Sequence, residues 1–129
     1  DDQQWRIYAR TNAYPPHFVS ANSVVQNSLV SEGCFVDGKL LDTVLFSGAT
    51  VENGAVVRDS VVMPGAVIKS GAVVQYAIIA ENAVIGENAK IGARPEECED
   101  KDSWGVVTIG PDMVIEDGQV VPPKAMLGK

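Results

Sequence analysis

The sequence predicts an all-β fold in which short parallel strands wind into a single-stranded β-helix, a prism built from hexapeptide repeats. A branched apolar residue returns every five or six positions from Val19 to Ile91 and again from Ile109 to Val121. A small residue, most often Ala or Ser, stands two positions before most of these apolar residues. An α-helix has a period of about 3.6 residues, and an ordinary strand is far shorter than this array. The short-period repetition therefore indicates a β-solenoid.

The repeats also carry a longer period. Steps of five residues begin at Val25, Leu41, Val57 and Val74, which lie 16 or 17 residues apart. This spacing gives a unit of about 17 residues with three strands and three corners. Sorting by this unit predicts three inward-facing stacks: Val19, Val36, Val51, Ile68, Ile85, Ile115; then Val25, Leu41, Val57, Val74, Ile91, Val121; then Val30, Phe46, Val62, Ile79, Ile109. We expect five to six coils. Since neighbouring strands lie ~4.8 Å apart, the rod is on the order of 25 Å tall.

Residues that tolerate turn geometry mark the predicted corners, among them Asn53-Gly54, Pro64-Gly65, Ser70-Gly71 and Asp117-Gly118. Gly and Asn adopt positive φ at low cost, so they gather where the chain must turn. The small residue that precedes each inward aliphatic lies close to a corner, where a bulky side chain would collide inside a narrow prism.

The chain divides into two predicted parts. Residues 1–18 form a linker and strand, with Trp5-Arg6-Ile7-Tyr8 extended and Pro15-Pro16 breaking the backbone. Residues 19–129 form the β-helix, interrupted by a charged excursion at 93–105 that we expect to replace most of a coil. Because the chain starts at Asp1 without Met and opens on a linker, we expect it to be the C-terminal segment of a longer protein.

Composition excludes several classes of partner. The net charge of −7 argues against nucleic acid and anionic membranes, since both require a basic face. No apolar run approaches the ~20 residues of a membrane span, and no signal peptide is visible. Cys34 and Cys98 form no CxxC pair, and Cys34 falls on a small inward position. This usage fits a reducing compartment, and we expect a cytoplasmic protein.

Apolar residues also occur at positions expected to face outward. The residue just before each inward aliphatic predicts an apolar stripe on the third face, formed by Leu29, Leu45, Val61 and Ile78. Phe18 and Phe35 stack in the same way on the first face. Part of this pattern reflects β-propensity, and part indicates burial against another subunit or domain. The excursion is either a solvated loop or an ordered contact to a neighbour, for which Trp104 is the candidate anchor.

The sequence contains no catalytic constellation. Its one histidine, His17, lies beside Pro16, where it is either an exposed linker residue or the general base that a hexapeptide acyltransferase would need. Metal-bearing coils need about three converging histidines, so no metal site is predicted. No phosphate-binding glycine loop is present.

Several ordered segments resemble the C-terminal left-handed β-helix domain of bacterial glucose-1-phosphate adenylyltransferase (ADP-glucose pyrophosphorylase). The similarity covers essentially the whole chain and is carried by Trp5-Arg6-Ile7-Tyr8 with Pro15-Pro16, residues 25–34 (VQNSLVSEGC), 41–46 (LDTVLF), 57–64 (VRDSVVMP), 77–86 (AIIAENAVIG) and 121–126 (VPPKAM). The bare repeat is unspecific, whereas this succession of coils is much more specific. The left-handed winding is implied by the resemblance, because spacing does not determine it.

The resemblance implies a parent enzyme that makes ADP-glucose and pyrophosphate from ATP and glucose 1-phosphate, with Mg²⁺, for glycogen synthesis. The catalytic site would lie in an N-terminal domain outside this segment, and the segment itself would need no cofactor. The β-helix would contact that domain, build a homo- or hetero-tetramer and border a cleft for anionic effectors. Glu81 stands where members of the family often carry a basic residue, which leaves Arg94 and Lys101 as effector-binding candidates.

Three other readings stay open. A noncatalytic regulatory paralogue of the same enzyme would share this domain. A hexapeptide acyltransferase-type coil would act alone and would depend on His17. A freestanding structural coil would bind no small molecule.

Overall fold

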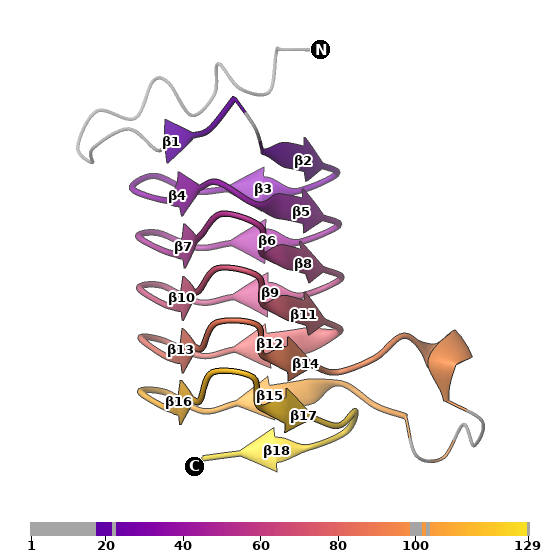
Figure 1. Cartoon of the computed structure of the whole chain (residues 1–129). Helices are drawn as coiled ribbons and strands as arrows, with labels where there is room; N and C mark the ends of the chain where they lie inside the picture. Colours follow the sequence, from indigo (N-terminus) through magenta and orange to yellow (C-terminus); the bar gives the residue numbers. More distant parts are fainter. Residues whose placement is uncertain (1–17, 22, 99–101, 103, 129) are drawn as a thin grey trace.

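A computed structural model describes residues 18–21, 23–98, 102 and 104–128 of the chain. It shows a left-handed parallel β-helix of six coils, in which three six-stranded parallel sheets form the faces of a prism (Figure 1). The all-β class, the single-stranded prism and its left-handed winding are thus confirmed. The predicted linker and His17 lie outside the described residues, as does the side chain of Phe18.

Each coil contributes one strand to each sheet. Sheet A contains β1 (Phe18–Val19), β4 (Phe35–Val36), β7 (Thr50–Val51), β10 (Val67–Ile68), β13 (Val84–Ile85) and β16 (Val114–Ile115). Sheet B contains β2 (Val24–Gln26), β5 (Lys39–Leu41), β8 (Val56–Arg58), β11 (Val73–Gln75), β14 (Lys90–Ile91) and β17 (Val120–Val121). Sheet C contains β3 (Leu29–Val30), β6 (Val44–Leu45), β9 (Val61–Val62), β12 (Ala77–Ile79), β15 (Val107–Ile109) and β18 (Met126–Leu127).

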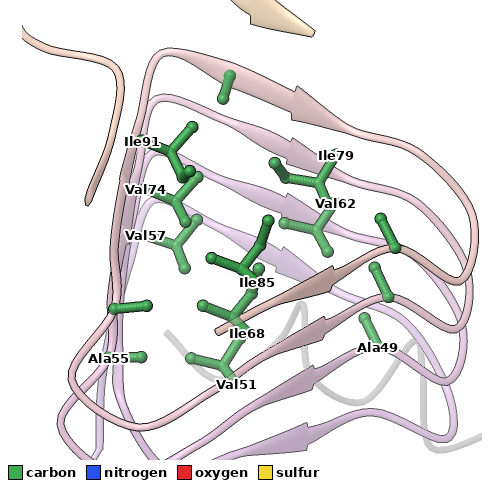
Figure 2. Packing of buried hydrophobic residues seen from close by; sticks show 14 of the residues in the cluster. Ala49, Val51, Ala55, Val57, Val62, Ile68, Val74, Ile79, Ile85 and Ile91 are labelled. Carbon is green, nitrogen blue, oxygen red and sulfur yellow. The ribbon is translucent and has the colours of Figure 1, made fainter. Parts of the chain in front are cut away.

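The core consists of aliphatic side chains stacked in register from coil to coil. Val51, Ile68 and Ile85 lie over one another on sheet A, while Val62 and Ile79 do the same on sheet C (Figure 2). All five are fully buried. The small residues near the corners are fully buried too, including Ala49, Ala55, Ala66, Ala72, Ala83 and Ala89. Thin layers of Val, Ile and Ala therefore fill the prism, as the period predicted.

Two inward positions differ from the prediction. Leu40 and Leu45 are fully buried and pair in register with Val57 and Val62, whereas Leu41 is half-buried and Phe46 is exposed. The prediction of Leu41 and Phe46 as inward residues is therefore wrong by one position.

A short corner causes this shift. Val36 to Leu40 is four residues, whereas the corresponding step from Val19 to Val25 is six. Gly38 makes the tight corner possible, because a Cβ atom there would collide with the backbone carbonyl oxygens of Ala55 and Glu52. The corner between β4 and β5 is thus two residues shorter than the corresponding corners. The sequence did not reveal this, because Leu40-Leu41 and Leu45-Phe46 each offer two adjacent apolar residues, either of which could face inward.

Four corners between sheets B and C, across which successive inward residues are five positions apart, share one backbone feature. Each contains a non-glycine residue with positive φ: Asn27, Asp42, Asp59 and Tyr76. The hydroxyls of Ser28, Thr43 and Ser60 follow in three of these corners and bond to the backbone. Ser28 Oγ accepts from the Thr43 N–H at 3.0 Å, and Ser60 Oγ accepts from the Ala77 N–H at 3.1 Å. These side chains link successive coils along the edge of the prism.

The excursion interrupts a single corner. It leaves sheet B after Ile91 and returns to sheet C at Val107, and it contains a short 3-10 helix, η1 (Pro95–Glu97). No sheet loses a strand there, since β15 pairs with β12 and β18 in unbroken order. The expectation that the excursion replaces most of a coil is therefore wrong, because it is inserted between two strands of a complete coil and projects from the prism (Figure 1).

Matched leucines test the corrected register. We expect Leu40→Ala to lower the free energy of unfolding by about 2–5 kcal/mol, because it opens a cavity in a fully buried layer. Leu41→Ala, on the half-buried neighbour, should cost about 1 kcal/mol or less. Urea denaturation of both variants measures the difference, and equal losses would contradict the register.

Candidate functional site

Sheet C carries an apolar stripe on its outer side, which we call the sheet C surface. Strand residues alternate between the two sides of a sheet, so the residue before each buried aliphatic faces outward. In-register pairing aligns six such residues: Leu29, Val44, Val61, Ile78, Thr108 and Met126. Leu29 is 52%, Ile78 41% and Met126 77% exposed. Five of these six side chains are apolar, and Thr108 is the exception. An ordered and largely apolar column of this length is typical of a surface that another subunit or domain covers.

Leu45 does not belong to this surface, although the sequence predicted that it would. It is fully buried and faces the core, because the short corner at Gly38 shifts the phase of its coil. Val44 takes the outward place, half-buried between Leu29 and Val61. The predicted positions of Leu29, Val61 and Ile78 on the outer side match the structure.

The other two faces differ in character. On sheet A, Phe35 is 40% exposed and pairs in register with Phe18, and the column continues through Thr50, Val67, Val84 and Val114. On sheet B, the exposed side chains of Lys39 and Lys90 interrupt the corresponding column. Sheets A and C are therefore the two apolar faces, and sheet B is the most polar.

The neck of the excursion, Gly92–Ala93 and Trp104–Val106, is tied to the prism. Trp104 is half-buried, and its indole Nε1–H donates to the Ala93 carbonyl at 2.6 Å. Its ring meets that of Tyr76 edge to face, with centroids 5.3 Å apart and planes at 79°. The structure thus places Trp104 against a corner of its own chain.

The electrostatic environment of this corner is mixed. Partial burial raises the pKa of the Tyr76 hydroxyl, and the Asp59 and Glu96 carboxylates raise it further, Asp59 also through a hydrogen bond. The positive charge of Arg58 opposes this effect. Arg58 Nε is itself buried and lacks a hydrogen-bond partner among the described residues.

Only one of the two effector-binding candidates can be placed. Arg94 is exposed and forms an ion pair with Glu97, with Nε and Oε2 3.9 Å apart, and its backbone N–H donates to Glu97 Oε1 at 3.1 Å. Lys101 lies outside the described residues. Glu81, at a corner between sheets C and A, is exposed. Arg94 therefore pairs with a carboxylate of its own loop. Because both side chains are exposed to solvent, this ion pair contributes little free energy.

The described part of the chain contains no group of three His, Cys, Asp or Glu side chains placed to hold a metal ion. No described helix has the length and apolar character needed to cross a membrane. Both cysteines are free thiols. Burial raises the pKa of the Cys34 thiol, although hydrogen bonding with the backbone of Ala49, Gly48 and Ser31 partly offsets this rise.

Tyr76 is the residue that sequence reasoning missed at this site. A signal was present, because aligning the four five-residue corners places Tyr76 at the position held elsewhere by Asn27, Asp42 and Asp59. Asn and Asp are enriched at positive φ, and a bulky aromatic residue there is unusual. The exception therefore marks the corner beside which the excursion returns.

The geometry defines a class, the left-handed β-helix domain of hexapeptide repeats. Within this class, residues 15–115 match the family described as "GlmU-like, C-terminal hexapeptide", and the chain belongs to that family. It is similar to glucose-1-phosphate adenylyltransferase of Bacillus cytotoxicus, with 40% identity over 52 residues, which are 40% of this chain and 14% of the relative. The aligned stretch thus spans about one seventh of that relative's length.

A solved structure confirms the fold at low sequence identity. The structure titled "Crystal structure of CcmM N-terminal domain in complex with CcmN" superposes with a TM-score of 0.54. The superposition covers 90% of this chain and 94% of the other chain, and the two sequences are 18% identical. The likeness concerns the fold alone.

The two cysteines should differ sharply in reactivity. At about pH 8, a disulfide reagent should modify Cys98 in the native protein but reach Cys34 only through opening of the prism. Since Cys34 is 2% exposed and its pKa is raised, we expect its reaction to be slower by a factor of about a thousand. Cys98→Ser should abolish the fast phase and Cys34→Ser should preserve it; fast labelling of Cys34 would contradict its place in the core.

Proposed function

We propose that this chain is the assembly and regulatory β-helix of a glucose-1-phosphate adenylyltransferase, which makes ADP-glucose and pyrophosphate from ATP and glucose 1-phosphate in glycogen synthesis. The observation that carries the proposal is the 40% identity over 52 residues to an enzyme of that name. The resemblance of further segments along the chain supports the same family, as does the left-handed prism.

The segment's own part in this function is structural. Its most prominent feature is the sheet C surface, and an in-register apolar column of this kind suits association with a second β-helix or with the catalytic domain. Catalysis would take place in the N-terminal domain, where we expect ATP, glucose 1-phosphate and Mg²⁺ to bind. The protein would work in the cytoplasm, where these substrates are found.

Effector binding is the less supported half of the proposal. Arg94 and Lys101 are the basic residues of the excursion that could meet an anionic effector. Arg94 already pairs with Glu97, and Glu96 lies beside it, so an anion would have to displace a carboxylate. We therefore assign assembly first and effector recognition second.

Activity of the complete protein separates the proposal from its alternatives. The full reading frame that encodes this segment should release pyrophosphate from ATP and glucose 1-phosphate in a Mg²⁺-dependent manner, measured with a coupled phosphate assay. An inactive protein that nevertheless associates with an active paralogue would identify the noncatalytic regulatory subunit. Acyl transfer that is lost in His17→Ala would instead establish the acyltransferase alternative, and either result would overturn the proposed activity.

Paired substitutions test the sheet C surface. Val44→Glu with Val61→Glu should weaken association by about a hundredfold or more, because two adjacent carboxylates would be buried at the interface. The matched control is Val56→Glu with Val73→Glu, two half-buried outward neighbours on sheet B. Analytical ultracentrifugation measures both.

The control separates loss of association from loss of folding. Both double variants place like charges directly opposite each other on adjacent strands, so they should lower stability by similar amounts. Only the sheet C variant should lower the oligomeric mass. If both variants keep the parent's mass, the assembly role of sheet C is wrong. Leu45→Glu is unsuitable, because that side chain faces the core.

A further inference from the structure

The excursion is joined to itself at its neck. The Trp104 indole N–H donates to the Ala93 carbonyl across eleven residues of chain, at 2.6 Å. The bond connects the point where the excursion leaves the prism with the point where it returns. The two ends of a long insertion need not contact each other, whereas here a hydrogen bond joins them at the point where they meet the prism.

Tyr76 provides the prism's side of this closure. Its φ is +49°, a region that costs free energy for a bulky L-residue. The backbone ladder imposes this conformation, since the Tyr76 N–H donates to the Arg58 carbonyl at 3.1 Å and the Tyr76 carbonyl accepts from the Val107 N–H at 3.0 Å. An Asn or Asp would satisfy the same corner with less strain, as in the other three coils.

The aromatic side chain supplies what a small residue cannot. Its ring packs edge to face against Trp104. Edge-to-face pairs are a favoured aromatic geometry and add to the free energy of simple burial. The strain at Tyr76 is therefore offset by a contact that exists only because the neck is closed.

The corner between β17 and β18, in the next coil, also contacts the neck. The Gly105 carbonyl accepts from the Lys124 N–H at 2.9 Å, and Lys124 Nζ donates to the Asp102 carbonyl at 2.9 Å. At the exit, Gly92 lies so close to the Gln75 carbonyl that a Cβ atom would collide with it. Contacts from the coils above and below thus converge on the neck.

The described part of the excursion contributes nothing to the hydrophobic core. Every buried apolar side chain of the described chain lies outside residues 92–106, and η1 buries no residue. Releasing the neck would therefore break the aromatic pair and a few hydrogen bonds while leaving the core layers intact. Local opening of this kind belongs to the low end of a protein's stability range.

We infer that Tyr76 is a positioning residue that holds Trp104, and that the neck of the excursion is a cooperative unit which opens separately from the prism. The unit borders the sheet C surface, because β12, which begins directly after Tyr76, carries Ile78, and because Val106 is 46% exposed at the neck. Closure thus fixes an apolar residue at the margin of that surface. This inference does not depend on the enzymatic activity of the parent.

Hydrogen exchange and fluorescence test the inference. In a Trp5→Phe background, Trp104 is the remaining tryptophan and reports on the neck by its emission and by exchange of its indole N–H. We expect Tyr76→Asn to shift the emission to the red and to speed exchange roughly tenfold for the indole N–H and for the Lys124 amide, which donates to the Gly105 carbonyl of the neck. Amides of the prism strands should keep their protection. Tyr76→Phe retains the ring and should change these rates less than about threefold.

Two further variants keep the result interpretable. Asp42→Asn makes the corresponding change at a positive-φ corner without a neck and should leave every rate unchanged. Trp104→Leu removes the aromatic pair from the other side and should speed exchange of the Lys124 amide as Tyr76→Asn does. If Tyr76→Asn fails to fold, Trp104→Leu decides the question. Unchanged exchange of the Lys124 amide, or loss of protection throughout the prism strands, would overturn the inference.

Discussion

The structure depends on register between coils. Each strand is only two or three residues long, so no strand could hold its place alone, and parallel hydrogen bonding to the coils above and below fixes all of them together. Because the side chains alternate across each strand, a slip of one residue would turn a whole layer of the core outward. A corner can therefore change in length only if the side chains of the following strand still alternate in register with those of the neighbouring coils, as they do after Gly38.

The spacing of aliphatic residues was sufficient to predict the class of fold, the three stacks and most inward positions. It failed at Leu40 and Leu45 because each has an apolar neighbour, so hydrophobicity alone could not choose between the two phases. The deciding fact was steric, a glycine pressed against the next coil. The neck was equally hidden, since the meeting of Tyr76 with Trp104 depends on where the excursion returns to the prism, and no periodic signal continues through residues 92–106.

The candidate site is a set of surfaces rather than a reaction centre. Family membership and the prism establish a scaffold, while the proposed enzymatic activity of the parent is inferred from a match to part of a much longer relative. Sheets A and C offer apolar faces and sheet B is interrupted by lysines, so the three sides of the prism are unequal. An assembly built from such a prism has a defined orientation, because only some of its faces favour contact.

The hydroxyl ladder along the edge between sheets B and C ends at Ala77, which has no side-chain oxygen with which to continue it. The very next corner is the one that the excursion enlarges. Where side-chain hydroxyls bond adjacent coils to each other, extra residues would have to break those hydrogen bonds. Where these bonds end, extra residues can be inserted without disturbing the neighbouring coils. Chain can therefore be added at this edge while the stacked layers stay constant, and a foreign peptide grafted here would not have to displace a hydroxyl of the ladder.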